Sequence, residues 1–317
     1  MKFNFIFFCK SFKGDLHRLK ILVNSFNEFN IENLKLVISI PKSDLPYFNI
    51  TLNENINLIT DESYTLSHLT NYDYKGTKAG YINQEICKLT FWKTDIALNY
   101  FCLDSDSQFI RPFSISDFMY NDVTPYTVLV QDKDLSLDKY YRKKFWIDRY
   151  ATVKKIYNEI NHKDNRYRTC HGHQTFNSLV LKSLENDFMI PRGYNYLDLI
   201  KIAPLEFTWY NVWFQKCKIV EEIACEPIFK TIHTRREYFF GKLQLLYLND
   251  FANEYVGIVL NSKWKPKTPL KYNNPNFLYI FLHYILTLRI WLFNELRGLI
   301  SIYIIQPLKH LYNNVFK

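Results

Sequence analysis

The sequence predicts an α/β fold with a mostly parallel central sheet flanked by helices, followed by a C-terminal helical tail. Strand, helix and strand patterns alternate through the first 60 residues, which is typical of parallel sheets. Further along, an apolar run at 100–103 ends abruptly in acidic residues. The 317 residues suffice for one large α/β domain and an appendage. We therefore expect a domain at 1–268 and a tail at 269–317.

Local patterns predict the first elements in order. Residues 3–9 are rich in Phe and Ile, and Lys10 interrupts this apolar run too early for a signal peptide, so a buried strand is expected. Apolar residues then recur at helical spacing over 16–26. Apolar runs at 34–40 and 56–60 predict two more strands, the first closed by a proline and the second by an acidic pair.

Polar residues follow these predicted strands. Lys10, Ser11 and Asp15 come after the first strand, and Asp61 comes after the third. Ligands of open α/β sheets bind outside the carboxyl ends of the strands, so we expect a nucleotide to lie across these residues. The loop lacks the glycine-rich GxGxxG pattern of dinucleotide-binding enzymes, which disfavours an oxidoreductase.

The helix expected over 81–98 carries two further candidates. Gln84 and Lys88 are four residues apart and therefore share one face. Lys88 is expected either to neutralise a diphosphate or to be an ordinary solvated lysine. The polar stretch at 63–79 before this helix predicts either a mobile lid over a site or plain surface.

Asp104-Ser105-Asp106 is the motif on which the functional prediction depends. On a continued strand the two carboxylates share a face, and on a turn both can reach one cation. Mg²⁺ and Mn²⁺ prefer oxygen ligands, typically one or two carboxylates together with substrate phosphates. The alternative is an ordinary turn, because Asp and Ser side chains bond nearby backbone groups.

Later segments add candidates of lower specificity. A strand at 126–131 and a long basic helix at 137–160 are expected before a short run that contains His171, His173 and Gln174. We expect these three residues at the N-terminus of the next helix, where backbone N–H groups favour anions, so they would bind sugar or phosphate. A polar helix cap is the alternative.

Glu206 lies in an aromatic segment at 204–214. Aromatic faces suit sugar rings, and a carboxylate among them is partly desolvated, so Glu206 is the candidate general base. The alternative is a core helix with Glu206 in its first turn. Strands are expected at 228–232 and 255–260, and His233 directly follows the first of these.

Four stretches, in order along the chain, resemble one family. Residues 103–113 (LDSDSQFIRPF) look like the DxD segment of GT-A glycosyltransferases, and more narrowly that of bacterial GT-A-like proteins of surface-polysaccharide loci. Residues 8–15 and 80–89 look like that family's opening strand and loop and its helix before the DxD strand. Residues 205–210 are a looser match to a Glu-Tyr-centred motif. The resemblance spans about 3–264, and only the DxD segment is specific.

This resemblance implies a GT-A fold and a metal-dependent glycosyltransferase. Asp104 and Asp106, with His233 as a late ligand, would hold Mn²⁺ or Mg²⁺. A nucleotide-diphospho-sugar would bind over the first strands and beside Ser105 and Lys88, with a UDP-sugar favoured over a GDP- or CMP-sugar. The acceptor would be a glycan or lipid-linked precursor of capsule or lipooligosaccharide. The alternatives are a nucleotidyl- or phosphosugar transferase and a non-catalytic glycan-binding protein of the same fold.

Composition and the tail bear on partners and location. The net charge is +9 without any recognisable nucleic-acid motif, which indicates an anionic lipid, nucleotide or glycan partner, or a lysine-rich proteome alone. Six scattered cysteines without a Cys-x-x-Cys pair are typical of reduced cytosolic thiols. Mostly apolar residues at 277–305, with polar positions near helical spacing, predict helices in the interface of the inner membrane at its cytoplasmic face. A helical homodimerisation element is the alternative.

Overall fold

The computed structural model describes most of the chain and divides it into two units. It describes residues 3–49, 53–129, 142–143, 147–163, 173–234, 237–238, 241, 246, 248–261 and 277–308. The main unit comprises 1–233 and 251–269, and the tail unit comprises 234–250 and 270–317. Residues 234–250 thus group with the C-terminal residues rather than with the rest of the main unit.

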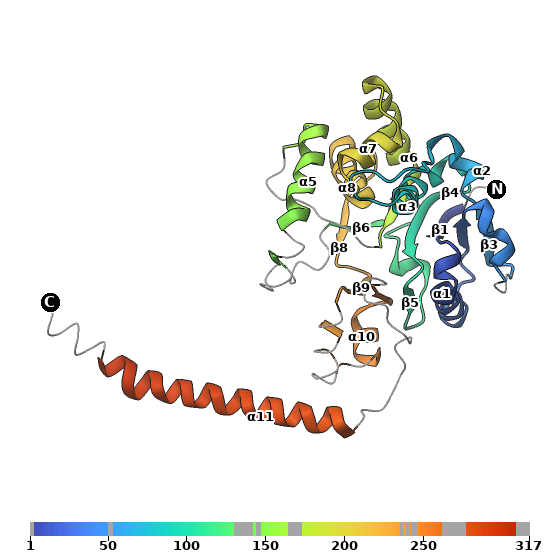
Figure 1. Cartoon of the computed structure of the whole chain (residues 1–317). Helices are drawn as coiled ribbons and strands as arrows, with labels where there is room; N and C mark the ends of the chain where they lie inside the picture. The colour runs from blue at the N-terminus through green and yellow to red at the C-terminus, as the bar shows by residue number, and fades with distance from the viewer. Residues whose placement is uncertain are drawn as a thin grey trace. The chain divides into compact units, whose positions relative to one another are not determined.

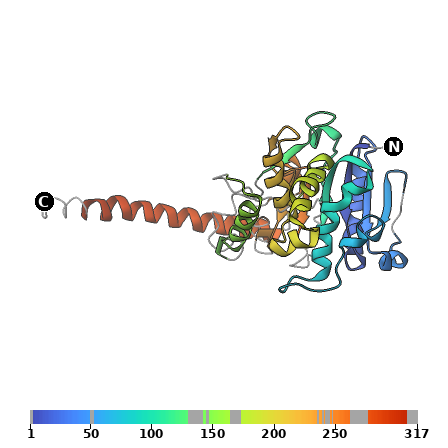
Figure 2. The same cartoon turned by 90° about the horizontal axis from the view of Figure 1, so that it is seen from above.

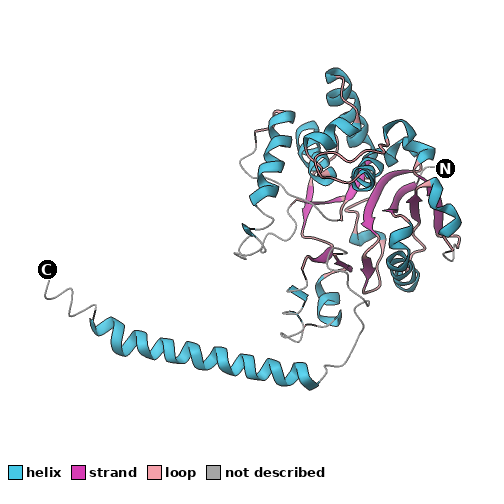
Figure 3. Ribbon diagram, in the orientation of Figure 1, coloured by secondary structure: helices cyan, strands magenta, loops and turns pink. Residues whose placement is uncertain are grey.

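A five-stranded sheet forms the centre of the main unit (Figures 1 and 3). Its strands lie in the order β3-β2-β1-β4-β7. They comprise β1 (Phe3–Lys10), β2 (Leu36–Ile40), β3 (Ile56–Thr60), β4 (Ala97–Asp104) and β7 (Thr175–Asn177). All neighbouring pairs are parallel except β4 and β7, which are antiparallel. The prediction of a mostly parallel central sheet flanked by helices is therefore confirmed.

Helices cover both faces of this sheet (Figure 2). Successive side chains of a strand point to opposite faces. Ile6 and Phe8 of β1 accordingly join one core cluster, with helices α3 (Ala79–Thr90) and α8 (Glu206–Cys217). Phe5 and Phe7 join the other core cluster, with α1 (Leu16–Phe29). The predicted buried character of the first strand follows from this double coverage.

Smaller elements complete the main unit. Strands β5 (Ser107–Phe109), β10 (Gly257–Leu260) and β9 (Phe229–Ile232) form a second sheet in that order. Strands β6 (Tyr126–Val128) and β8 (Ile223–Cys225) pair in parallel. The remaining helices are α2 (Glu62–Thr65), α5 (Ile147–Ile160), α6 (Ser178–Ser183) and α7 (Tyr196–Ile202), and α10 (Leu248–Glu254) extends from the tail unit into the main unit.

Two predicted helices begin or end elsewhere. The helix expected over 81–98 ends at Thr90, because a 3₁₀ turn and the left-handed Asp95 (φ 52°) reverse the chain before β4. The helix that was expected to have His171, His173 and Gln174 at its N-terminus begins only at Ser178. Residues of β7 pair with β4 first, and the Asn177 side chain accepts a hydrogen bond from the Leu179 N–H as the helix cap.

The tail unit contains α11 (Phe277–Ile300), drawn in red in Figure 1, and a π-helical turn (Ser301–Ile305). The expected helical character of 277–305 is thus confirmed. Within the part of the chain that the structure describes, no helix combines the length and the apolarity needed to cross a bilayer.

Candidate functional site

The candidate site lies at the carboxyl edge of the parallel sheet, between β1 and β4. Lys10 ends β1, Asp104 ends β4, and the two residues are register partners. From β1 the strand order runs to β2 and β3 on one side and to β4 on the other. The connection therefore reverses direction here, which is where open α/β sheets bind their ligands.

Lys10 and Asp61 form a buried ion pair at this edge. The Lys10 ammonium lies 3.0 Å from Asp61 Oδ2, and the Ser39 hydroxyl donates to Asp61 Oδ1 at 2.6 Å. The Tyr64 hydroxyl lies 2.9 Å from the same serine. Burial raises the pKa of Asp61, although the charge of Lys10 opposes the shift. The structure thus brings together the loop residues that the sequence placed after two separate strands.

Ser11 and Ser105 connect this pair to the DxD motif. The Ser105 hydroxyl donates to Ser11 Oγ at 2.9 Å, and both residues are buried. Asp15 makes different contacts. It directly precedes α1 and forms an ion pair with Arg18, one helical turn further on. Of the predicted donor-binding residues in the first loop, Lys10 and Ser11 therefore join the candidate site, and no described contact joins Asp15 to it.

Gln84 and Lys88 of α3 share one face, as their spacing predicted, and both contact Asp104. Gln84 Nε2 donates to Asp104 Oδ1 at 3.0 Å, and Lys88 Nζ donates to the same oxygen at 2.8 Å. The Lys88 side chain is 2% exposed and that of Asp104 is 29% exposed. The interpretation of Lys88 as a solvated surface lysine is wrong, because packing between α3 and the sheet buries it.

Lys88 also pairs with Glu206, the first residue of α8. Its ammonium lies 2.8 Å from Glu206 Oε1 and 4.7 Å from the centre of the Phe207 ring. Burial alone would lower the pKa of Lys88, but the two carboxylates outweigh it and raise that pKa well above the usual range. Burial likewise opposes ionisation of Asp104, yet the charge of Lys88 lowers the Asp104 pKa on balance. The three residues form a charged bridge from α3 to β4 and α8.

Glu206 occupies the position that both sequence interpretations expected. It is buried in the first turn of a core helix, as the structural alternative predicted. Its ion pair with Lys88 also links it, through Asp104, to the end of β4. The Lys88 ammonium holds one carboxylate oxygen of Glu206, so proton abstraction would fall to the other oxygen.

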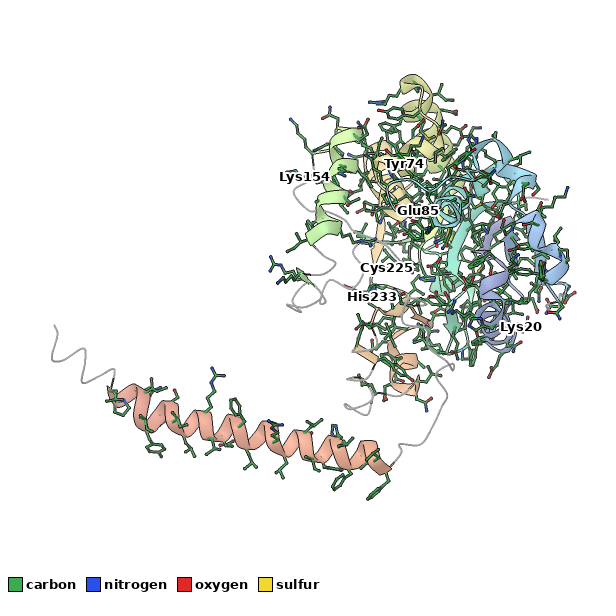
Figure 4. The ribbon with its side chains drawn as sticks, viewed as in Figure 1. Lys20, Tyr74, Glu85, Lys154, Cys225 and His233 are labelled. Carbon is green, nitrogen blue, oxygen red and sulfur yellow. The ribbon has the colours of Figure 1, made fainter. Side chains whose placement is uncertain are left out.

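Glu85 is a residue that the sequence interpretation missed. It is 1% exposed, and neither carboxyl oxygen has a hydrogen-bond partner within 3.5 Å among the described residues. Burial and the nearby Glu206 raise its pKa well above the usual range, against the influence of Tyr81, Lys88 and Arg149. Figure 4 labels Glu85 on α3 among the packed side chains of the main unit. The sequence carried a signal, since Glu85 shares the apolar stripe of α3 with Ile82, Ile86 and Leu89.

Replacing Glu85 by glutamine is expected to stabilise the protein by roughly 0.5–2 kcal/mol at pH 7–8. A carboxyl group whose pKa rises on folding weakens the folded state as the pH climbs above its unfolded value of 4.5. Glutamine keeps the shape and removes this titration. Thermal unfolding at pH 5, 6, 7 and 8 should show a gap between variant and wild type that widens with pH. The exposed Glu28 of α1 supplies the control, E28Q. A difference in melting temperature between E85Q and wild type that stays the same at all four pH values would contradict the prediction.

His173 supports the backbone of the DxD motif. The Asp104 N–H donates to His173 Nε2 at 3.1 Å, and the Ser107 hydroxyl lies 2.7 Å from the same nitrogen. Burial lowers the pKa of His173 to about 4, so the ring is neutral at pH 7 and stacks on Phe229 at 5.3 Å. A neutral ring that accepts a backbone N–H fixes the end of β4.

The expected anion site at a helix N-terminus is wrong for His173 and Gln174. Both residues precede β7, and the following helix begins only at Ser178. Gln174 is buried and pairs through its backbone with Cys102 of β4. These residues are therefore sheet supports rather than helix-terminal ligands. His171 lies outside the described residues.

The carboxylates of Asp104 and Asp106 could supply some of the oxygen ligands of a divalent cation. Asp104 Oδ1 accepts bonds from Lys88 and Gln84, and among the described hydrogen bonds none is made to its Oδ2. Asp106 follows at the same corner and is half-buried, with its carbonyl accepting from the Leu260 N–H. Two carboxylates suit Mg²⁺ or Mn²⁺ when substrate phosphates complete the coordination.

His233 follows β9 and is separated from Asp106 by one strand. Its neighbour Ile232 is the register partner of Leu260, which in turn bonds the Asp106 backbone. Two strand spacings amount to about 10 Å. Figure 4 labels His233 at the end of this strand. Within the described ranges no three His, Cys, Asp or Glu side chains gather as a metal site, so the structure does not assemble Asp104, Asp106 and His233 as one.

Comparisons with known proteins give likenesses of fold among solved structures only. No family model and no curated protein sequence matches the chain. Among solved structures, the chain is similar to mouse xyloside xylosyltransferase 1 in its apo form, with 7% sequence identity and a TM-score of 0.47. The match covers 86% of this chain and 100% of the other. The chemistry of the site is therefore judged from its own residues.

Proposed function

We propose that the chain is a metal-dependent glycosyltransferase that moves a sugar from a nucleotide-diphospho-sugar to a glycan or lipid-linked acceptor. The observation that carries this proposal is the convergence of Lys10, Ser11, Asp61 and Asp104 at the carboxyl edge of the parallel sheet. Cationic, hydroxyl and carboxylate groups from separate strands meet there, at the edge where open α/β sheets bind their ligands.

Each group has a role that suits its position. The buried Lys10–Asp61 pair and the Ser11 and Ser105 hydroxyls would face the nucleoside and its phosphates. Asp104 and Asp106 would hold Mn²⁺ or Mg²⁺ against the diphosphate, and such a cation supplies charge stabilisation to the leaving group. Glu206 would accept the proton of the acceptor hydroxyl if the configuration inverts, and would bind the sugar if it is retained.

Thermal unfolding with nucleotide-sugars tests this proposal. A UDP-sugar with Mn²⁺, at about 100 times its dissociation constant, should stabilise the protein by roughly 2.7 kcal/mol, a rise in melting temperature of several degrees. GDP- and CMP-sugars should give smaller shifts, and each donor should act more weakly without Mn²⁺. D104N should lose the part of the shift that depends on Mn²⁺. Absence of a shift with all three donors would overturn the proposal and favour a non-catalytic glycan-binding role.

A further inference from the structure

The positive charge of the chain is concentrated in its last 56 residues. Residues 262–317 contain eight of the 40 lysines and arginines but one of the 31 acidic residues, Glu295. They therefore account for seven of the nine net positive charges. The preceding 261 residues are nearly neutral, so a lysine-rich composition of the whole chain does not explain the excess.

Helix α11 lies within this basic segment and exposes an unusual amount of apolar surface. None of its described side chains is buried. A soluble helix normally keeps its large apolar residues against a core and exposes its polar face. Here the large apolar side chains are themselves exposed. From α11 and the turn after it, those at least 44% exposed are Phe277, Leu278, Phe281, Tyr284, Ile285, Leu288, Leu292, Phe293, Leu296, Leu299, Ile300, Ile302, Tyr303, Ile304 and Ile305.

The helix has two opposite sides despite its high apolar content. With 3.6 residues per turn, Phe281, Ile285, Leu288 and Leu292 fall along one line. His283 and Thr287 fall along a line on the opposite side. The uncharged polar positions thus gather on one side of the axis, with Glu295 beside the apolar line and Ile290 on the polar side as exceptions. Such a grouping is the pattern of a helix that lies at a boundary between water and an apolar phase.

We propose that α11 lies flat in the headgroup region of an anionic bilayer, with the Phe281–Leu292 line among the acyl chains. The exposed Arg289 and Arg297 would direct their guanidinium groups to lipid phosphates while their stems cover apolar surface. This proposal is independent of the catalytic one, because it uses no residue of the candidate site.

Charge distinguishes between the two candidates that could cover the apolar side of α11, a bilayer and a second copy of the chain. In a pair of α11 helices each helix would carry one net positive charge, from Arg289, Arg297 and Glu295, and each 262–317 segment holds six further lysines outside the helix. An anionic lipid surface instead attracts every one of these charges, and each basic residue near such a surface strengthens binding by a factor of roughly five. Charge complementarity therefore favours lipid.

Flotation of the full chain with vesicles tests the proposal. Vesicles of phosphatidylcholine with 30% phosphatidylglycerol should bind the protein at least about tenfold more tightly than phosphatidylcholine alone, and 0.5 M salt should weaken this binding. L288Q/L292Q should lower the partition coefficient at least about tenfold, because it removes apolar contact while keeping helix propensity. R289Q/R297Q should lower it on anionic vesicles only.

The matched control is H283Q/T287Q, which changes two residues at the same spacing on the opposite side. It should bind within about twofold of the wild type, and all variants should keep the melting temperature of the main unit. Equal flotation of L288Q/L292Q and wild type would overturn the proposal. Failure of the wild type to bind anionic vesicles, together with dimers that L288Q/L292Q converts to monomers, would show that a second copy covers α11.

Discussion

Replacing Lys88 by methionine is expected to destabilise the protein by about 3–5 kcal/mol. Lys88 is almost fully buried and neutralises both Asp104 and Glu206 at 2.8 Å. Methionine fills a similar volume but leaves two carboxylates without their cation, and Glu206 is only 9% exposed. Urea denaturation at pH 7.5 should show the loss as a lower midpoint.

The neighbouring pair of Lys93 and Glu185 provides the matched control for this loss. It has the same chemistry and the same 2.8 Å distance, but both side chains are more than a fifth exposed. K93M should therefore cost about 1 kcal/mol or less, since exposed ion pairs are worth little. The double variant K88M/E206Q should recover part of the K88M loss by removing one orphaned charge. Equal losses for K88M and K93M would contradict the prediction.

The sign of the pH dependence follows from the two shifted pKa values. Lys88 has a raised pKa, so its stabilising effect is complete below its unfolded value of 10.5 and is lost as the pH rises through the higher folded value. Asp104 has a lowered pKa, so its effect is complete above 3.8 and is lost as the pH falls further. The contribution of the wild-type pair should consequently stay nearly constant between pH 6 and 9, whereas the cost of K88M should grow with pH, because carboxyl groups left buried without a cation destabilise the folded state once they must ionise.

The parts of the fold that were predicted correctly rest on local signals. Apolar runs bounded by Pro41 or Asp61 placed β2 and β3 within two residues of their observed limits. The rule that carboxyl ends of parallel strands share one edge then placed Lys10, Asp61 and Asp104 together. The same-face rule for helices placed Gln84 beside Lys88. None of these steps needed contacts between distant segments.

The parts that could not be predicted depend on long-range packing. Lys88 and Glu206 are 118 residues apart, and no spacing in the sequence links them. Strand β7 has only three residues and is a strand because it pairs with β4. His173 therefore precedes a strand and supports the sheet, whereas the sequence predicted it at a helix terminus. Glu85 was passed over because a lone acidic residue on an apolar stripe has no chemical motif around it.

The candidate site therefore contains two separate clusters of buried ion pairs. Lys10 and Asp61 pair at one end of the edge, and Lys88 bridges Asp104 and Glu206 at the other. Buried pairs of this kind contribute little net stability against apolar residues of the same volume. Their presence at a ligand-binding edge suits a role in holding charged groups in fixed positions, where preorganised charge lowers the barrier of a group transfer.

Replacing Glu206 by glutamine is expected to lower turnover by roughly 10²–10⁴-fold, the range for loss of a general base. Glutamine keeps the size of the side chain and can still accept a hydrogen bond from Lys88, but it cannot take a proton from an acceptor hydroxyl. The measurement is the initial rate of sugar transfer under saturating donor across pH 5–9, alongside the melting temperature of each variant.

The pH profile of kcat distinguishes Glu206 as a general base from Glu206 as a residue that only holds Lys88 in place. If Glu206 abstracts the proton, E206Q loses the acidic limb of the profile of kcat, because that limb reports ionisation of the base in the enzyme–substrate complex. If Glu206 only holds Lys88, the profile keeps its shape and the rate falls in step with stability. E185Q, which removes the carboxylate of the Lys93 pair, should keep turnover within about twofold of the wild type. Near-normal turnover for E206Q would remove Glu206 from the chemistry and leave it as the counter-charge that keeps Lys88 against Asp104.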